Sequence, residues 1–223
     1  PDRQPLAEVL TKVNNLCVRI ITVPNALHER IGHTSPVLEY YGKNVGIRRA
    51  RGQFVLTTNP DIIFTDHLIN EIARRELDPA FFYRTDRYDF VGTGIESVEP
   101  DQYVDFALAA TFQGHLATDD GYKTAVIEPS DTRTLDQLPA SQFAPDVVHT
   151  NACGDFILAA RSAFFKVRGL LESTTELNHI DSISLLKLVK ALCGQRVFAS
   201  PLCIFHQDHE RNHIPGSWTH EQL

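Results

Sequence analysis

A basic cluster stands near residue 45, where Lys43 is followed by Arg48, Arg49 and Arg51. Small residues between these cations permit close backbone packing, and the cations suit the charge of a diphosphate. A solvated basic helix face explains the same pattern equally well. The cluster therefore predicts either a diphosphate site or an exposed helix face.

An asparagine and a carboxylate, Asn59 and Asp61, directly follow an apolar run at residues 54–57. In open α/β sheets, ligands bind beyond the carboxyl ends of strands. A carboxylate at that edge can hold Mg²⁺ or Mn²⁺ against substrate phosphates with few protein ligands. Asn-Pro-Asp is also good turn chemistry, so a simple turn would explain the motif if it stood alone.

Two more carboxylates precede predicted elements. Asp155 follows Gly154, which permits a tight backbone approach, and leads into an apolar run at residues 156–160. Asp181 comes directly before a helix predicted over residues 182–192. It is either the N-cap of that helix or an oriented catalytic carboxylate, and by itself the cap is the simpler explanation.

Three histidines lie near the end of the chain. His206, His209 and His213 have spacings that can group imidazoles on a helix as metal ligands. The preceding residues favour a strand instead, and Gln207 and Asp208 break the His-Glu-x-x-His pattern of zinc proteases. Exposed histidines in a polar tail are the alternative.

Strands and helices alternate in the first part of the chain. The segments expected to form these elements, in order, are residues 17–23 (strand), 38–51 (helix), 54–57 (strand), 66–76 (helix), 81–83 and 88–91 (strands). Residues 24–36 read as a loop, and Asp66 is the expected cap of the second helix. This alternation predicts an α/β fold with a mostly parallel sheet and flanking helices.

The second part of the chain begins with a polar stretch. Residues 92–148 hold four prolines and many Asp and Thr, which predicts a loop-rich acceptor or lid region. Strands are then expected at residues 156–160, 196–199 and 203–206, and a polar tail from residue 207. The whole of 1–223 is taken as a single domain.

Composition excludes several classes of protein. The 223 residues are 43% hydrophobic, so the chain is not intrinsically disordered, and its formal net charge of −7 argues against a general nucleic-acid binder. No apolar run is long enough for a membrane span. The four Cys form no C-x-x-C pair and no short disulfide framework, which favours a reducing compartment. Cys153 reads as a buried thiol rather than a nucleophile. The absence of Met and the opening Pro1 suggest a piece of a longer protein.

The order of these clusters resembles the core of GT-A glycosyltransferases of the family 2 type. Lys43-Asn44-x-Gly46-x3-Ala50-x-Gly52 is similar to that family's Arg-Asn-x-Gly-x3-Ala-x-Gly, and it is likewise followed by a strand and an Asp-bearing turn. The later residues that resemble the family's acceptor half and its closing His are Asn151 to Phe156, Arg161, Arg168, Gly169, Glu172, Asp181 and His206 to His209. The likeness covers roughly residues 17–91 and 149–213.

The chain departs from the family pattern in three places. The Asp-x-Asp turn keeps only its final acid, Asp61, and the Glu-Asp pair reads Ile180-Asp181. The family's first strand, first helix and second strand have no room before residue 17. The expectation is a GT-A-like domain whose N-terminal strands are missing, with an exposed sheet edge.

The resemblance implies a function and a set of roles. The function is transfer of a sugar from a nucleotide-diphosphate donor to an acceptor hydroxyl, with inversion and assistance from Mn²⁺ or Mg²⁺. Asp61 and His206 would hold the metal, while Asp181, with Asp155 as runner-up, would be the base. The residues expected along the donor are Lys43, Asn44, Arg48 and Asn59.

The expected partners follow from the same resemblance. They are a UDP- or GDP-sugar and a saccharide or other hydroxyl acceptor, with no nucleic acid and no transmembrane segment, in the cytoplasm or peripheral to a membrane. The alternatives are a degenerate domain that binds a sugar or nucleotide without catalysis, and a nucleotidyltransferase. The second would need an N-terminal Gly-rich phosphate loop, which these 223 residues do not show.

Overall fold

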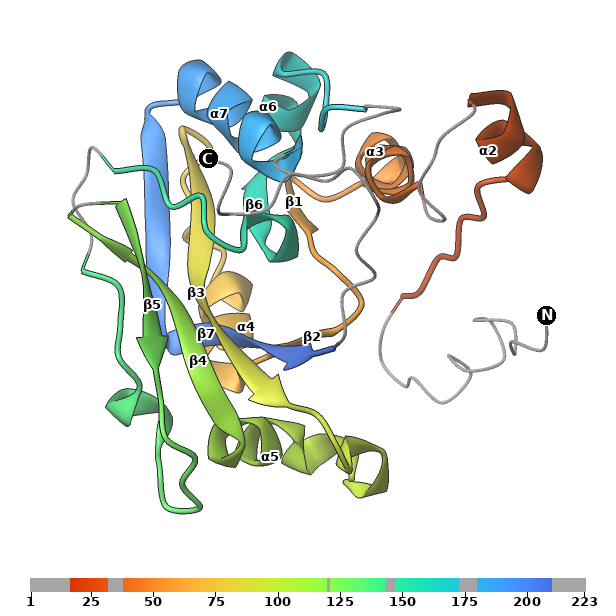
Figure 1. Ribbon diagram of the computed structural model, residues 1–223. Coiled ribbons are helices and arrows are strands. Elements are labelled where there is room, and N and C mark those ends of the chain that lie inside the picture. The colour runs from red at the N-terminus through yellow and green to blue at the C-terminus, as the bar shows by residue number, and fades with distance from the viewer. Residues whose placement is uncertain (1–16, 32–37, 120, 143–146, 173–179, 210–223) are drawn as a thin grey trace, which may run out of the picture.

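A computed structural model describes residues 17–31, 38–119, 121–142, 147–172 and 180–209 (Figure 1). Their fold is mixed α/β, with one curled, mixed sheet of seven strands and helices packed against it. The strands are β1 (Phe54–Thr57), β2 (Ile62–Phe64), β3 (Phe81–Val91), β4 (Thr111–Thr118), β5 (Gly121–Val126), β6 (Ile157–Ala160) and β7 (Gly194–Asp208). The α-helices are α2 (Asn25–Ile31), α3 (Glu39–Arg49), α4 (Asp66–Ala73), α5 (Tyr103–Ala109), α6 (Arg161–Lys166) and α7 (Ile180–Ala191).

The prediction of a mostly parallel sheet is wrong. The strand order is β1-β6-β3-β4-β5, with β7 paired to β3 and β2, and only the β3–β7 pair is parallel. Strands β1 and β3 do run the same way, as the alternation of strands and helices predicts. However, β6 inserts between them in the opposite direction and turns both contacts antiparallel. Strands β4 and β5 add an antiparallel hairpin beyond β3.

Strands β3 and β7 form the centre of the fold. They pair along the whole of β3, with one irregularity in register between Thr85 and Asp86. The sequence predicted two short strands in place of each, because polar residues and Ser200-Pro201 interrupt the apolar runs. Tertiary pairing overrides these local breaks, so charged residues of β3 lie inside the molecule.

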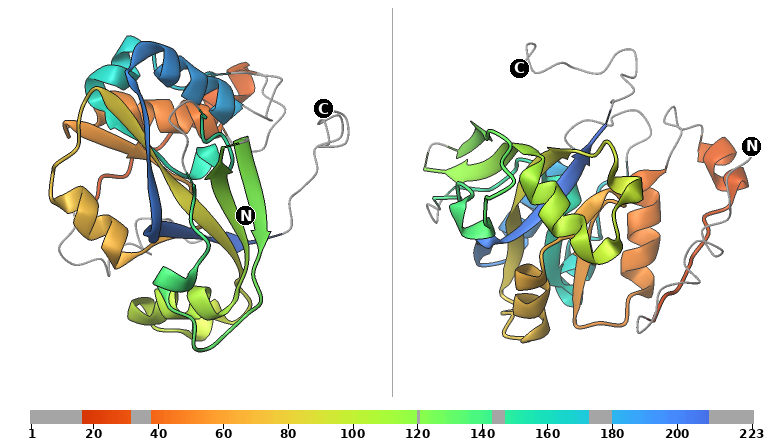
Figure 2. Two further views of the ribbon diagram at one scale, coloured as in Figure 1. Left: turned by 90° about the vertical axis from the view of Figure 1, so that its left-hand side faces the viewer. Right: turned by 90° about the horizontal axis from the view of Figure 1, so that it is seen from below.

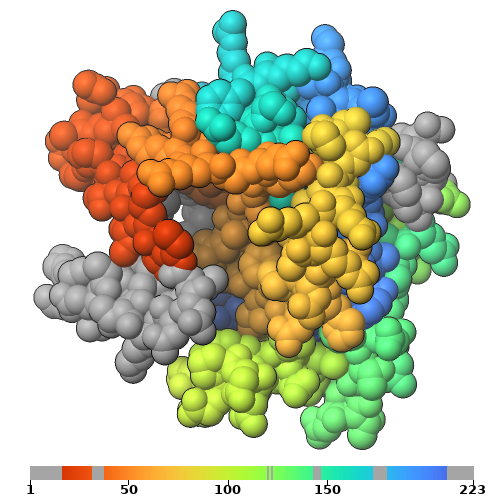
Figure 3. All heavy atoms as spheres, turned by 180° about the vertical axis from the view of Figure 1, so that it is seen from behind, coloured from red at the N-terminus to blue at the C-terminus, as the bar shows by residue number. Residues whose placement is uncertain are grey.

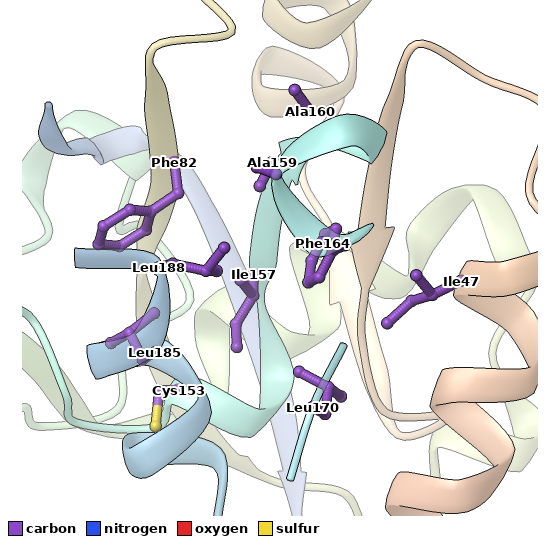
Figure 4. Close-up of a cluster of buried hydrophobic side chains, with 11 residues drawn as sticks. Ile47, Phe82, Cys153, Ile157, Ala159, Ala160, Phe164, Leu170, Leu185 and Leu188 are labelled. Atoms are coloured by element: carbon purple, nitrogen blue, oxygen red, sulfur yellow. The ribbon is translucent and has the colours of Figure 1, made fainter. Parts of the chain in front are cut away.

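Helices cover both faces of the sheet (Figures 1 and 2). Helices α3, α6 and α7 pack over a cluster that includes Phe82, Ala159, Phe164 and Leu185, as Figure 4 shows. The neighbouring residues Tyr83 and Leu158 point to the opposite face, where they meet α4. Helix α5 packs with the C-terminal end of β3 and the β4–β5 hairpin around a third hydrophobic cluster.

Three local expectations are corrected. Residues 17–23 form no strand and are mostly exposed, and residues 25–31 of the expected loop form α2. The 92–148 segment holds α5, β4 and β5 within its described part, so it is not simply loop-rich. The expectation that strands are missing before residue 17 lies outside the described residues, although β1 pairs only with β6 within them.

Helix starts also differ from expectation. The Thr65 hydroxyl accepts the Leu68 N–H and caps α4, so Asp66 is its first helical residue rather than its cap. Helix α7 begins at Ile180, which places Asp181 in the first turn rather than at the N-cap. A carboxylate in a first turn still faces the positive end of the helix dipole.

Candidate metal and ligand site

The expected site lies where several strands of the sheet end. Strands β1, β3 and β7 run in the same direction, so their carboxyl ends meet there. Antiparallel β6 begins at this edge. The topology therefore brings Asp61, Asp155 and His206 together, although they lie far apart in the sequence.

Asp61, His206 and His209 form a group that could hold a metal ion, because one ligand atom from each lies within 4.8 Å of the others. Asp61 Oδ2 is 3.4 Å from His206 Nε2 and 3.1 Å from His209 Nε2. Ligand atoms about 2.1 Å from a common ion lie roughly 3.0–3.4 Å apart, so this spacing fits. The buried Asp61 Oδ1 has no hydrogen-bond partner among the described residues.

The charges of this group are coupled. A hydrogen bond from His206 lowers the pKa of Asp61 to about 2, against the opposing effect of burial. Burial disfavours the charged form of His206, yet hydrogen bonds to Asp61 and Asp89 raise its pKa to about 9. An imidazolium thus stands between two carboxylates, and any metal that binds here must displace its proton.

The carboxylate of Asp89 connects His206 to a buried arginine. Its Oδ1 is 3.1 Å from His206 Nδ1 and 3.0 Å from Arg87 Nε, and its Oδ2 is 2.8 Å from His115 Nε2. Burial opposes ionisation of Asp89, but hydrogen bonds from His115 and His206 lower its pKa well below the usual range. The side chain is therefore a fixed anion that orients both imidazoles.

The row of polar groups continues from Arg87 to α3. Arg87 Nη1 donates to Asp155 Oδ2 at 2.5 Å, and Asn59 Nδ2 donates to Asp155 Oδ1 at 2.7 Å. Lys43 Nζ then donates to Asn59 Oδ1 at 2.6 Å and to the Gly154 carbonyl at 3.0 Å. We call this continuous chain the polar row; its members are Lys43, Asn59, Asp155, Arg87, Asp89, His206, Asp61 and His209.

A fully buried arginine beneath the polar row holds the loop that carries Asp155. The guanidinium of Arg84 donates to the carbonyl oxygens of His149, Asn151 and Cys153 at 2.9–3.2 Å. Asn151 in turn contacts His115. Three backbone groups are thus satisfied by one side chain, which fixes the approach to β6.

Asp181 lies beside this loop. Its carboxylate accepts the Ser182 N–H, and a Cβ added at Gly154 would meet its Oδ2 at 3.1 Å. Glycine at 154 thus permits the close approach of α7 to the loop. Asp181 is half-buried and stands next to the polar row rather than within it.

Two predicted donor residues lie outside the polar row. Asn44 is buried, and its amide bonds the backbone N–H and carbonyl of Leu170 and the Glu172 carboxylate. Its observed role is structural, so donor binding by Asn44 stays a prediction that this geometry does not favour. Arg48 is exposed on α3.

The prediction that Cys153 is a buried thiol is confirmed. Cys153 is buried in the cluster under α7, and burial raises the pKa of its thiol to about 12. A thiol that stays protonated is a poor nucleophile.

Sequence reasoning missed Arg84, Arg87, Asp89 and His115. A signal was present, because four charged residues fall within residues 84–89, inside an otherwise apolar and aromatic strand. Charged side chains buried in a central strand are rare unless paired. Their partners come from other strands, which the sequence alone does not place.

No helix among the described residues is long and apolar enough to cross a membrane. Neither a scan against protein-family models nor a search of curated proteins found a match to this chain.

Proposed function

We propose that this protein transfers a sugar from a nucleotide-diphosphate donor to an acceptor hydroxyl with the help of a divalent ion. The observation that carries the proposal is the Asp61, His206 and His209 group at the carboxyl ends of parallel strands β3 and β7. Ligands bind at such edges in α/β proteins. A lysine and two further carboxylates lie along the same edge, where a diphosphate and an acceptor would need them.

The donor set favours Mn²⁺ over Mg²⁺, because imidazole suits transition metals and Mg²⁺ prefers oxygen ligands. Asp61, His206 and His209 would hold the ion, which would stabilise the charge that develops on the leaving diphosphate. Lys43 lies at the other end of the polar row, with its ammonium held by Glu39, Asn59 and the Gly154 carbonyl. A contact from Lys43 to the donor would replace one of these three acceptors.

Asp181 is the better candidate for the base. Asp155 is buried, and its two oxygens already accept from Arg87 and Asn59, so a proton on Asp155 would break the ion pair. Asp181 is half-buried and engages one backbone N–H. In the proposed reaction it takes the proton of the acceptor hydroxyl while that oxygen attacks the anomeric carbon and the diphosphate leaves.

The test combines metal binding with turnover. Mn²⁺ binding is measured by electron paramagnetic resonance with and without UDP or GDP, and release of nucleotide diphosphate is followed for a panel of UDP- and GDP-sugars. We expect Asp61→Asn to weaken Mn²⁺ binding at least tenfold, because it removes the only carboxylate of the group. Asp131→Asn, an exposed carboxylate remote in sequence from the group, is the matched control and should leave binding unchanged.

Two results would contradict the proposal. Equal Mn²⁺ affinity for wild type and Asp61→Asn would show that this group does not bind the metal. Normal turnover in Asp181→Asn would show that Asp181 is not the base, since loss of a general base costs about 10²–10⁴-fold in rate.

A non-catalytic binding domain is the second candidate. The internal use of Asp155 by Arg87 and Asn59 favours it, because a locked carboxylate contributes nothing to proton transfer. Binding of UDP or GDP in the presence of Mn²⁺, without turnover of any donor tested, would select this candidate.

A further inference from the structure

Charge is divided between two ends of the molecule. Helices α3, α6 and α7 hold seven basic residues and two acidic ones, whereas the described residues 92–119 and 121–142 hold eight acidic residues and two basic ones. Figures 1 and 2 place α6 and α7 at one end of the molecule and α5 at the other. The chain as a whole is acidic, yet these three helices carry a net positive charge. The electrostatic potential is therefore asymmetric, with its positive side at the three helices.

The two acids of the basic end do not cancel its outward charge. Glu39 pairs with Lys43 at 2.6 Å beside the polar row. Asp181 faces Gly154 in the loop next to the same row. Both acids therefore belong to the site side of these helices, which leaves the outward cations without acidic neighbours on α6 and α7.

Apolar side chains stand among these cations. Helix α7 turns Leu185 and Leu188 toward the core, as Figure 4 shows, yet Ile183 and Leu186 remain 46% and 51% exposed. On α6, Phe165 is 49% exposed. A helix with apolar residues on both sides is normally covered on both sides.

The exposed residues of α6 and α7 form one surface. Both helices pack on the same core cluster, so their outer sides face away from the sheet together, and Figure 3 shows them adjacent. Lys166 Nζ donates to the Ala191 carbonyl and joins the ends of the two helices. We call this surface the basic apolar face; it comprises Arg161, Phe165, Lys166, Ile183, Leu186 and Lys190.

We infer that the basic apolar face docks on an anionic phospholipid surface. Apolar side chains flanked by Lys and Arg are the composition of surfaces that lie in the headgroup region of a bilayer. Each Lys or Arg near such a surface adds attraction to acidic headgroups, and long basic side chains can keep their charge in water while their stems are buried. The end formed by α5 and the turns before it, which carry Glu96, Glu99, Asp101 and Asp105, would point away from the lipid, so the charge separation also sets the orientation. This inference is independent of the proposed function.

The alternative partner for a basic surface is a nucleic acid. Phosphate backbones need cations but gain nothing from half-exposed Ile and Leu on a helix. Three apolar side chains among the cations therefore favour lipid.

The experiment is sedimentation of the whole chain with unilamellar vesicles in 0.1 M NaCl. Vesicles of phosphatidylcholine alone are compared with vesicles that contain about 30% phosphatidylserine. We expect binding only to the second kind, at least a tenfold loss for Arg161→Glu/Lys190→Glu, and a several-fold loss for Leu186→Gln. The matched controls are Lys123→Glu and Val126→Gln, both exposed on β5 and outside the basic apolar face. Circular dichroism confirms that each variant is folded.

Three outcomes would overturn the inference. The first is equal binding to the two kinds of vesicle. The second is an equal loss of binding for Lys123→Glu and for the double variant. The third is tighter binding to a single-stranded RNA 30-mer than to the vesicles, with no effect of Leu186→Gln, which would assign the face to nucleic acid.

Discussion

Replacement of Asn44 by alanine tests whether the most family-like segment of the chain binds a ligand or holds the fold. Its Oδ1 accepts the Leu170 N–H at 2.8 Å, and its Nδ2 donates to the Leu170 carbonyl at 2.9 Å and to Glu172 Oε1 at 2.8 Å. The left-handed backbone of Gly169, with φ of +72°, brings Leu170 to the amide. Asn44 thus fastens α3 to the segment after α6.

The cost follows from what the substitution leaves behind. Both backbone groups of buried Leu170 lose their partner, and a buried donor or acceptor left unsatisfied costs about 1–3 kcal/mol. We therefore expect Asn44→Ala to lower the free energy of unfolding by about 2–6 kcal/mol. Urea unfolding followed by far-UV circular dichroism measures this change. Asn70→Ala, at an exposed position of α4, should change stability by less than about 0.5 kcal/mol.

The donor-binding interpretation predicts the opposite pattern. Asn44→Ala would then weaken binding of UDP or GDP with little change in the urea midpoint. A loss of stability below about 1 kcal/mol would refute the structural reasoning, because no hydrogen-bonded backbone pair could then depend on this amide.

Three further predictions concern buried charges. Burial raises the pKa of Asp86 to about 6, so its contribution to stability is complete below pH 3.8 and is lost as the pH rises through 6. Wild type should therefore lose about 2 kcal/mol of stability between pH 4 and 7 that Asp86→Asn does not lose, as measured by urea unfolding at each pH. Arg84→Met should cost about 3 kcal/mol or more, because three buried carbonyls lose their donor. Arg133→Met, which removes a contact to the Leu108 carbonyl, should cost under half as much in the same assay. Against the opposing effect of burial, hydrogen bonds to Asp61 and Asp89 raise the pKa of His206 to about 9. Its contribution to stability is therefore complete below pH 6.5 and is lost as the pH rises through 9. The melting temperature of wild type, measured in EDTA, should show this fall, and that of His206→Gln should not.

Most elements could be predicted from local patterns. The structure confirms helices near residues 38–51, 66–76 and 182–192, and strands at 54–57 and 156–160. These segments carry their own signals, such as apolar spacing, capping residues and β-branched runs. The strand expected at residues 17–23 has such a signal too, yet no described strand pairs with it, because a strand also needs a neighbour.

Strand direction could not be predicted in the same way. Alternation of strands and helices fixes the relative direction of β1 and β3, and that part holds. It says nothing about a later strand that enters between them, and β6, which begins 66 residues after the end of β3, does so. The same insertion carries Asp155 to the place where β1 and β3 end, so the strand that makes the sheet prediction wrong also brings Asp155 into the polar row.

The site itself was half predictable for a related reason. Asp61 follows the apolar run at residues 54–57, and His206 closes the strand expected at residues 203–206, so the sequence marks both. Arg87 and Asp89 stand within β3, where their charges contradict the expected burial. Their presence changes the chemical roles of the predicted residues. Because Arg87 and Asn59 occupy both oxygens of Asp155, that carboxylate orients the polar row, and the proposed function assigns proton transfer to a carboxylate outside it. Asp181 is the predicted residue that meets this condition, since it lies against the loop of Asp155 and is not held by any cation of the polar row.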